Sequence, residues 1–401
     1  MSEKNITCPS KKQRCGGCSL LDLPYSAQLE KKKAQAEFYL GEFGKVEGIF
    51  GMEDAFHYRN KAISTFATGP RGTLINGIYE ARSHRVIKAE DCLLQDKRIN
   101  EVIKAVRFAA SRCKYKAYDE DTGTGLIRHT VIRRGAKSGE VSVTIVTPTK
   151  FLPNAKNFVK FIREACPDVV TVVQNINPTH TSAVLGNSEV VLYGKGFIID
   201  KLCDMDFAIS SKAFYQVNSL QTEKLYALAA EFAELTGNET VIDAYCGIGT
   251  IGLSVSNKCK SVLGIEINRD SVRNANDNAK RNNITNASFI CGDAGAVMKD
   301  LARKGQSADV VFMDPPREGS TVDFMRSMVS FSPKKIVYIS CNPETQARDL
   351  KYLVKQGYKV KRMCAVDMFP HTEHVESVVL LSRKDVHERI KFDVTVEDFF
   401  K

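Results

Sequence analysis

One cysteine, Cys341, directly follows an apolar run, IVYIS, and precedes an asparagine and a proline. The run predicts a buried strand, and the proline marks the start of a loop. A thiol at such a point either acts as a nucleophile or packs as a small apolar side chain. Packing is expected for most other cysteines, such as Cys113, Cys166 and Cys259. Cys341 differs because a strand end is an edge where function is often placed.

An acidic segment near the C-terminus, AVDMFPHTEHVES, leads into another strand-like run. Glu376 stands at the start of that run, and His371 and His374 precede it. We expect the three side chains to flank the cleft that contains Cys341. A His-x-x-His pair is only a weak indication of zinc. A thiol together with a carboxylate suits a reaction that needs a nucleophile and a base.

Four other apolar runs also end in residues that suit ligand binding. The segment DAYCGIGTIG puts Gly247 and Gly249 where the chain turns into a helix, and glycine lets a ligand approach the backbone closely. The next runs end at Glu266, Asp293 and Asp314. An acid about 20 residues beyond the glycines suits ribose hydroxyl groups. Asp293 is placed to accept from an adenine amino group.

These strand ends share one edge if the strands are parallel. From about residue 201, apolar runs of four to seven residues alternate with helical segments, which predicts an α/β, Rossmann-like parallel sheet covered on both faces. Ligands of such sheets bind outside the carboxyl ends of the strands. The glycine loop and the three acids at successive strand ends resemble the S-adenosylmethionine fold of class I methyltransferases, with a nucleotide-binding dehydrogenase or a degenerate sheet as the alternative. The predicted strands are 240–245, 261–268, 287–293, 308–314 and 335–341.

The first half of the chain has a different pattern of apolar and polar residues. Residues 25–41 predict a helix, because they are rich in Ala, Gln, Glu and Lys and end in glycine. From 57 to 193, β-rich stretches are separated by Gly, Pro and Asn, with helices expected near 99–113 and 155–165. This pattern predicts an antiparallel α+β domain.

Composition limits the class of protein. Residues 1–200 carry 30 Lys and Arg against 21 Asp and Glu, so this half holds +9 of the net charge of +10. The asymmetry indicates a polyanionic partner, although a soluble surface that leans positive is the alternative. The start is polar, without a signal peptide, and no apolar run is long enough for a membrane span. Twelve cysteines in such a chain favour a reducing cytoplasm over a disulfide framework.

A cysteine cluster stands near the N-terminus. Cys8, Cys15 and Cys18 lie in CPSKKQRCGGC, and Cys92 is a fourth candidate. Four thiolates bind zinc or a [4Fe–4S] cluster, and the spacing alone does not decide between them. Four unpaired thiols are the alternative.

Five motifs together resemble one family. FYQVN, DAYCGIGTIG, DPPREG, SCNPET and MFPHTEHVESV are similar to segments of the bacterial RNA uracil-5-methyltransferases, which belong to class I of the S-adenosylmethionine-dependent methyltransferases. The resemblance runs from the first cysteines to about Lys384, and SCNP with HTEHVE is its most specific part. Members of the family methylate 23S ribosomal RNA or the T-loop of tRNA. A cytosine-5 methyltransferase would show a Pro-Cys pair at the nucleophile, which is absent here.

The resemblance implies a role for each motif. Cys341 is the nucleophile that adds to C6 of uracil, and Glu376 is the base that removes the C5 proton. The residues that contact S-adenosylmethionine are Gln216, Tyr245, Thr250, Glu266, Asp293 and Asp314. Asp314 also holds the uracil edge. The cysteine cluster of the family is iron–sulfur, which makes Cys8, Cys15, Cys18 and Cys92 the ligands of a [4Fe–4S] cluster.

The resemblance also implies a domain organisation. Residues 1–22 form the cluster loop, 23–56 a helical segment that packs on the catalytic domain, 57–200 an RNA-binding domain that includes Cys92, and 201–401 the methyltransferase domain. Many relatives carry a small β-barrel before the cysteines, and we expect it to be absent here. The expected protein is a cytoplasmic monomer that acts on 23S ribosomal RNA, with tRNA as the second candidate and no DNA or membrane partner. A non-catalytic iron–sulfur RNA-binding protein is the alternative from another class.

RNA contacts are then expected from the middle domain. Basic residues there alternate with aromatic ones, which suits phosphate binding and base stacking. Solvated charge on strands is the alternative. The basic candidates are Arg59, Lys61, Arg128, His129, Arg133 and Arg134, and the aromatic candidates are Tyr58, Phe66 and Tyr79. We expect the target uridine to be flipped out of its stack to reach Cys341.

Overall fold

A computed structural model describes residues 8–383 except 9, 12–13, 81–82, 180 and 182. The chain forms two compact units and passes from one to the other several times. Unit 1 comprises Met1–Tyr25, Glu53–Leu220 and Pro370–Thr372, and unit 2 comprises Ser26–Met52, Gln221–Phe369 and Glu373–Lys401. In the part of the chain that the structure describes, no helix has both the length and the apolar character needed to cross a membrane.

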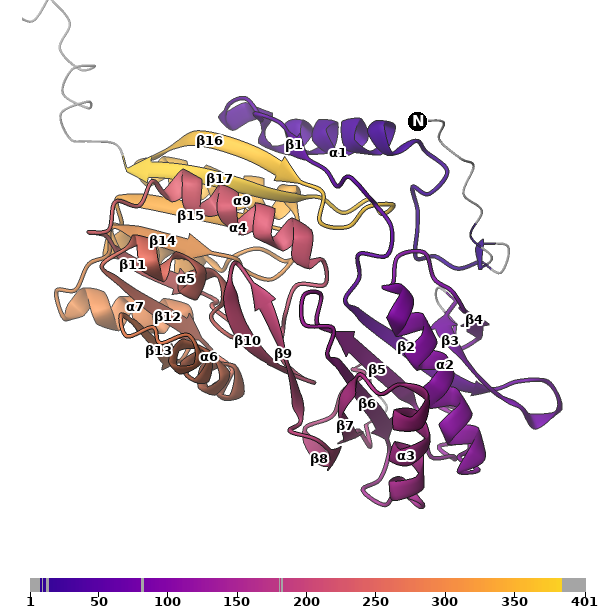
Figure 1. Cartoon of the computed structure of the whole chain (residues 1–401). Helices are drawn as coiled ribbons and strands as arrows, with labels where there is room; N and C mark the ends of the chain where they lie inside the picture. Colours follow the sequence, from indigo (N-terminus) through magenta and orange to yellow (C-terminus); the bar gives the residue numbers. More distant parts are fainter. Residues whose placement is uncertain are drawn as a thin grey trace, which may run out of the picture. The chain divides into compact units, whose positions relative to one another are not determined.

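Unit 2 contains an eight-stranded sheet. The strands are β1 (Ile49–Phe50), β11 (Thr240–Ala244), β12 (Ser261–Glu266), β13 (Ala287–Cys291), β14 (Val310–Met313), β15 (Lys335–Ser340), β16 (Tyr358–Val366) and β17 (Glu376–Arg383). Their order is β1-β16-β17-β15-β14-β11-β12-β13 (Figure 1). Strands β11 to β15 are parallel, whereas β17 runs antiparallel to both of its neighbours. The Rossmann-like parallel α/β sheet predicted from the sequence is therefore confirmed, and so is the one reversed C-terminal strand that the family resemblance implies.

Helices cover both faces of this sheet. All four residues of β14 are buried, and because successive side chains of a strand point to opposite faces, both faces must be covered. The helices that lie wholly or mostly in unit 2 are α1 (Tyr25–Leu40), α4 (Ser219–Ala233), α5 (Thr250–Val255), α6 (Arg269–Arg281), α7 (Ala294–Arg303), α8 (Val322–Phe331) and α9 (Pro343–Lys355). Short 3-10 turns, η2 (Gly41–Phe43) and η4 (Ser256–Lys258), follow α1 and α5.

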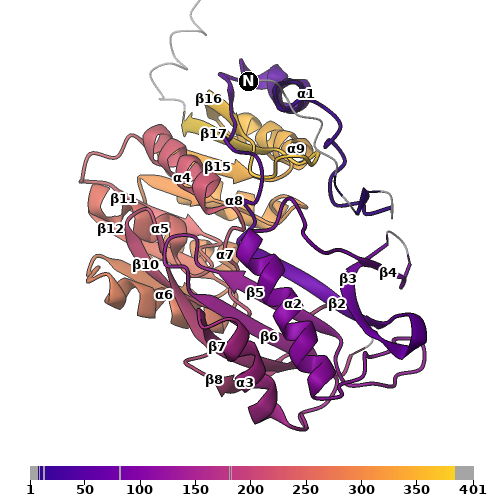
Figure 2. The same cartoon turned by 45° about the vertical axis from the view of Figure 1, so that its right-hand side comes forward.

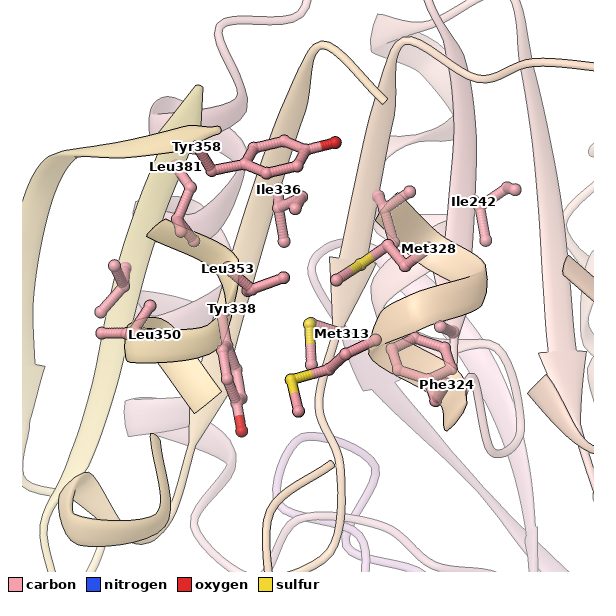
Figure 3. Close-up of a cluster of buried hydrophobic side chains, with 14 of the residues drawn as sticks. Ile242, Met313, Phe324, Met328, Ile336, Tyr338, Leu350, Leu353, Tyr358 and Leu381 are labelled. Carbon is pink, nitrogen blue, oxygen red and sulfur yellow. The ribbon is translucent and has the colours of Figure 1, made fainter. Parts of the chain in front are cut away.

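One cluster of buried side chains joins this sheet to α7, α8 and α9. Met313 and Tyr338 from the sheet meet Met328 of α8 and Leu350 and Leu353 of α9 (Figure 3). Burying a leucine completely stabilises a fold by roughly 1.5–3 kcal/mol relative to leaving it exposed. The strands are therefore held rigidly, and their ends make a firm platform for a site.

Side-chain caps fix the points where strands turn into helices. Asn268, Asp293, Thr321 and Asn342 each accept a hydrogen bond from a backbone N–H in the first turn of α6, α7, α8 and α9. Such a cap contributes about 1 kcal/mol. Three of these caps lie within three residues of a strand end, so only a very short turn separates the end of each strand from the start of the next helix.

Unit 1 contains a seven-stranded sheet and a hairpin. The sheet strands are β2 (Lys61–Thr68), β3 (Leu74–Tyr79), β4 (Val86–Lys88), β5 (His129–Arg134), β6 (Val141–Thr147), β7 (Val169–Ile176) and β8 (Ser188–Tyr193), and β9 (Phe197–Leu202) and β10 (Met205–Ser210) form the hairpin. The order is β4-β3-β2-β5-β6-β7-β8. Every neighbouring pair is antiparallel except β6 and β7. The exception arises because the chain returns through a helix, as parallel pairing requires.

Two helices lie on one face of the unit 1 sheet. They are α2 (Lys97–Arg112) and α3 (Ala155–Ala165), and they lie side by side (Figure 2). Their buried residues pack with Phe66, Ile132 and Val143 of the sheet into a second core. A short 3-10 turn, η3 (Pro70–Gly72), joins β2 to β3.

Candidate active site at the carboxyl edge of the unit 2 sheet

The pairing of β15 with β17 brings Cys341 and Glu376 to the same edge. Ser340 pairs with Ser377 in this antiparallel ladder, so the residue after Ser340 lies opposite the residue before Ser377. Those two residues are Cys341 and Glu376. On the other side, Glu376 pairs with Val366 of β16. The reversed direction of β17 is therefore what places the start of a strand beside the carboxyl end of β15.

Burial and mutual charge control how these groups ionise. Glu376 is 3% exposed, and burial, together with the charge of Asp314, raises its pKa to about 8. Burial also raises the pKa of Asp314 to about 7. The pKa of the Cys341 thiol rises to about 11 through burial and the charges of Glu376 and Asp314, while Arg317 opposes the rise. The thiol is protonated at neutral pH, and the pKa of Glu376 is close to the range in which a general base works best.

The loop that carries Arg317 is fastened to the start of α9. The backbone carbonyl of Arg317 accepts hydrogen bonds from Thr345 Oγ1 at 3.1 Å and Asn342 Nδ2 at 3.3 Å. The backbone N–H of Ser320 donates to the buried carboxylate of Asp349 at 2.7 Å. These bonds hold the loop that begins at Asp314 beside the residues that follow Cys341.

The glycine loop after β11 contains three residues in the left-handed region of backbone space. Tyr245, Gly247 and Gly249 have φ angles of 67°, 56° and 87°. A Cβ at Gly249 would lie 3.2 Å from the ring of Phe289, whereas one at Gly247 would face open space. The backbone at Gly247 is therefore accessible to a ligand, and the turn delivers Thr250 to the first position of α5.

A buried carboxylate lies below this loop. Asp243 is fully buried, and its Oδ2 accepts from the backbone N–H of Gly252 at 2.7 Å. No group among the described residues donates to its Oδ1. Burial raises the pKa of Asp243 to about 7, with further increases from the charges of Asp314 and Glu266. An unsatisfied, buried carboxylate oxygen is costly, and the raised pKa reduces this cost because it favours the neutral acid.

The other predicted donor-binding residues of unit 2 stand at the same edge. Glu266 ends β12, and its Oε2 accepts from the backbone N–H of Gly247 at 3.1 Å. Asp293 follows β13 and caps α7. The hydroxyl of Tyr245 lies 3.0 Å from Ser320 Oγ, and that of Thr250 lies 2.9 Å from the Tyr226 hydroxyl. With Asp314, five of the six predicted residues thus lie at or just beyond the carboxyl ends of parallel strands.

Gln216 is the sixth, and it belongs to unit 1. Its backbone carbonyl accepts a hydrogen bond from Asn60 Nδ2 at 3.0 Å. Its contact with the methyl donor stays a prediction.

The four predicted cluster cysteines share one pocket of unit 1. Cys8, Cys15, Cys18 and Cys92 line a cavity of about 380 Å³, together with Arg59 and other residues. The pKa of Cys18 is raised to about 12 by burial and by the charges of the other three cysteines. No group of three or more metal-binding side chains in the described ranges is arranged to hold a single ion.

Most of the predicted RNA contacts in the middle domain are wrong. Arg128, His129 and Arg133 are 3%, 5% and 2% exposed, and Tyr58 and Phe66 are buried as well. His129, Arg133 and Phe66 lie in β5 and β2, which are central strands of the unit 1 sheet, and five of the six residues of β5 are buried.

Two of the predicted basic residues also form ion pairs within this domain. The guanidinium of Arg128 pairs with Glu120 and donates to two backbone carbonyls. The guanidinium of Arg134 pairs with Asp96 at 3.0 Å. These cations support the fold and leave little charge for a partner.

Two residues of the unit 2 edge escaped the sequence reasoning. Asp243 was not identified because its burial and its unpaired oxygen atom are visible only in the structure. Its position just before the glycine loop is the one feature of the sequence that could have indicated it. Arg317 was not identified from the sequence, because Asp314 was the only candidate taken from the motif DPPREG. Its influence on Cys341 depends on the fold of the loop around it.

Known proteins are similar to this chain in sequence. Residues 195–384 match a family described as tRNA (uracil-5-)-methyltransferase. An uncharacterized RNA methyltransferase of Halalkalibacterium halodurans is 42% identical over 384 residues, which cover 94% of this chain and 83% of that protein. One from Staphylococcus aureus strain N315 is 42% identical over 380 residues, covering 93% and 83%.

A solved structure is similar as well. The tRNA (uracil-54, C5)-methyltransferase of Pyrococcus abyssi, in complex with S-adenosyl-L-homocysteine, is 29% identical with a TM-score of 0.76, over 92% of this chain and 86% of that one. The sheet, its glycine loop and its acidic strand ends define a class I methyltransferase that uses S-adenosylmethionine. The sequence similarity takes the assignment further: the chain belongs to the tRNA (uracil-5-)-methyltransferase family and is an RNA methyltransferase of the uracil-5 type.

Proposed function

We propose that this enzyme converts a uridine of structured RNA to 5-methyluridine through a covalent adduct between Cys341 and C6 of the base. The observation that carries the proposal is the β15–β17 register, in which Cys341 follows Ser340 and Glu376 precedes its partner Ser377. A nucleophile and a buried base at one edge are what addition at C6 and proton removal at C5 require.

The roles follow from the chemistry of uracil. After its proton has passed to solvent, the sulfur of Cys341 bonds to C6, and the electrons of the C5–C6 double bond become an enolate on C5, C4 and O4. S-adenosylmethionine, when bound, supplies a methyl group on a positively charged sulfur, which the enolate carbon accepts. Glu376, after its own proton has also passed to solvent, then removes the proton from C5. The electrons of that bond restore the double bond and expel the thiolate, which can attack again.

The donor is assigned to the carboxyl edge of the sheet. It carries an ammonium group, ribose hydroxyls and an adenine amino group, which need carboxylates as partners. We assign Glu266 to the ribose and Asp293 to the adenine, while the fully buried Asp243 holds the glycine loop through the Gly252 N–H. Contacts from Tyr245, Thr250, Gln216 and Asp314 remain part of the proposal.

We propose 23S ribosomal RNA as the target, on the basis of the family resemblance of the motifs. The T-loop of tRNA is the second candidate, because the similar Pyrococcus abyssi enzyme is named for uracil 54 of tRNA. Neither the glycine loop nor the Cys341 edge distinguishes between the two RNAs.

For the cysteine pocket we propose a [4Fe–4S] cluster held by Cys8, Cys15, Cys18 and Cys92. The four cysteines line one pocket, and four cysteine thiolates are the usual ligands of such a cluster. All twelve cysteines lie in the described part of the chain, and no disulfide joins any two of them. Because methyl transfer needs no electron, we assign the cluster a structural role.

RNA that contains 5-fluorouridine tests the covalent step. Fluorine at C5 cannot be removed as a cation by Glu376, so the adduct should persist after methyl transfer. We expect mass spectrometry to find the adduct on the peptide of Cys341 when S-adenosylmethionine is present. Unmodified transcripts of 23S ribosomal RNA and tRNA, incubated separately and mapped for 5-methyluridine, identify the target.

A second cysteine of unit 2 supplies the control. Cys341→Ala is expected to abolish both adduct and product. Cys291→Ala changes an exposed cysteine at the end of β13 and is expected to keep both. Product formation by Cys341→Ala would contradict the proposal, and so would an adduct on any other cysteine.

A further inference from the structure

Helix α3 of unit 1 carries a basic stripe on its exposed side. Lys156, Lys160 and Arg163 are all exposed, while Phe158 and Ile162 of the same helix are fully buried. The three cations are four and three residues apart, a spacing that aligns side chains along one face of a helix. The α3 stripe is defined here as these three residues.

The stripe borders a shallow depression. An open pocket of about 350 Å³ is lined by the three cations together with Val159, Glu164 and Tyr193 of β8. Because the pocket is open and its rim is cationic, it suits an extended anion that lies across the surface.

One cation of the stripe is held in place by an aromatic ring. The guanidinium of Arg163 lies 4.2 Å from the ring centroid of Tyr193. The end of β8 is itself fixed, because Thr171 Oγ1 donates to the Tyr193 carbonyl at 2.7 Å and accepts from the Gly196 N–H at 2.9 Å. A stacked guanidinium keeps its N–H groups at the ring edge, where they are able to bind a phosphate.

The stripe does not serve the stability of the helix. Like charges one turn apart repel, and the one acidic partner is Glu164, 3.8 Å from Lys160. Within the described part of the chain, no carboxylate forms an ion pair with Lys156 or Arg163. This distinguishes the stripe from Arg128 and Arg134, whose charges are neutralised by acidic neighbours.

We propose that the α3 stripe binds the phosphate backbone of the substrate RNA, a contact that is independent of base sequence. The inference rests on the proposed function, because it takes the substrate to be a structured RNA. RNA fits better than a protein partner, since phosphates repeat along the strand as the cations repeat along the helix. Exposed Lys and Arg without acidic partners release counterions when they bind phosphates, so the contact should depend strongly on salt.

Salt-dependent binding tests the proposal. The variant Lys156→Gln/Lys160→Gln/Arg163→Gln is titrated with an unmodified transcript of 23S ribosomal RNA, and with a tRNA transcript, at several KCl concentrations. We expect the affinity to fall by about 10-fold or more at low salt, and the slope of log affinity against log salt to decrease by about 2 for three lost contacts. The kcat at saturating RNA should stay unchanged, because the stripe holds the RNA and does not react.

A matched variant controls for net charge. Lys355→Gln/Lys359→Gln/Lys361→Gln removes three exposed lysines from unit 2, and it is expected to retain the wild-type salt slope. Lys156→Arg/Lys160→Arg keeps the positive charge of the stripe and should bind RNA like the wild type. Weaker binding by this variant would contradict the proposal even if the triple variant folds poorly. Tyr193→Ala is expected to lose part of the affinity, because it releases the Arg163 guanidinium.

The outcomes separate this inference from the proposed function. If wild-type protein forms the Cys341 adduct while the triple variant keeps its affinity and slope, the stripe does not bind RNA and the proposed reaction stands. An equal loss in the unit 2 control also overturns the inference. If wild-type protein forms no adduct with either fluorinated RNA, the proposed function fails first.

Discussion

Glu376 must be both buried and chemically basic, and these two requirements oppose each other. Burial raises its pKa from 4.5 to about 8, so the folded protein holds the proton over a range in which the unfolded chain releases it. The unfolded state therefore binds fewer protons between about pH 4.5 and 8. The stability that a neutral Glu376 provides is complete below pH 4.5, and it is lost as the pH rises toward 8. A base at this place has a cost in stability at neutral pH.

The variant Glu376→Gln should separate these two effects. At pH 8 we expect it to be more stable than the wild type by about 2 kcal/mol, since one pKa unit corresponds to about 1.4 kcal/mol and the new amide still needs partners. At pH 4.5 the two proteins should be equally stable. Methylation should fall by about 10²–10⁴-fold, because the C5 proton loses its acceptor. Urea titrations at the two pH values and single-turnover assays measure both effects.

A surface glutamate controls for the loss of one charge. Glu344→Gln changes an exposed residue in the first turn of α9, and neither its pH-dependent stability nor its activity should follow the same pattern. A Glu376→Gln protein that gains nothing at pH 8, or that still methylates RNA at the wild-type rate, would contradict the role of the base.

Single residues were predictable where the motif itself carries the chemistry. Cys341 and Glu376 stand in two specific motifs, and the register of β15 with β17 places them at one edge, although their roles stay predictions. The burial of Asp243 and its unpaired oxygen atom were not predictable, because sequence does not reveal hydrogen bonds. Residue types report chemistry well, whereas the satisfaction of each polar atom depends on packing.

At the scale of elements, a buried ion pair joins α1 to the end of β16. Lys32 Nζ lies 2.5 Å from Asp367 Oδ1 and donates to the Phe369 carbonyl at 3.0 Å. The two side chains are 1% and 0% exposed. Asp367 directly follows Val366, the partner of Glu376 in the β16–β17 ladder. This pair therefore anchors the strand end that lies beside the proposed base.

Breaking the pair should cost far more than breaking an exposed one. Lys32→Met leaves Asp367 buried without its cation, and we expect the free energy of unfolding to fall by about 3–5 kcal/mol. Lys33→Met, on the same helix, removes an exposed pair with Glu37 and should cost less than about 1 kcal/mol. Denaturant titrations compare the two. Similar losses in both variants would show that α1 is not anchored through Lys32.

Elements were predictable where the apolar pattern is strong. The runs at 240–245 and 335–341 became β11 and β15 with small shifts at the ends. The packing of α1 was not predictable, because its buried residues are Gln28, Lys32, Ala36 and Leu40, and two of the four are polar. For the central strand β5 the prediction failed, because its basic residues His129 and Arg133 were expected to be exposed but are buried in the sheet.

At the scale of the whole molecule, the net charge of a region does not say which of its cations are exposed to a partner. Residues 1–200 carry a net charge of +9. Ion pairs within unit 1, such as that of Arg98 with Asp168 at 2.6 Å, do not change this net charge, but they fix the positions of individual cations. The α3 stripe is different because its cations remain exposed. Composition thus indicated a polyanionic partner for this half, but only the fold separates cations that support the structure from those that face solvent.

The cysteine pocket gives the last prediction, because it makes the fold of unit 1 depend on a bound group. Its thiols come from the loop of Cys8, Cys15 and Cys18 and from Cys92, far along the chain, so a cluster would cross-link two segments. We expect anaerobically purified protein to contain about four irons and four sulfides per chain. Cys92→Ser should lose most of both and should lower the melting temperature of unit 1, because the cross-link is gone.

A cysteine of unit 1 outside the pocket makes this test specific. Cys203→Ser changes the turn between β9 and β10 and should retain iron, sulfide and melting temperature. Zinc in place of iron would contradict the cluster but keep a metal at the same four thiols. Protein that is fully folded with neither metal nor sulfide, and with the same melting temperature in the Cys92→Ser variant, would mean that the four thiols stand unligated. The N-terminal loop would then be held to unit 1 by backbone contacts such as the Leu20 N–H to the His371 carbonyl at 3.0 Å.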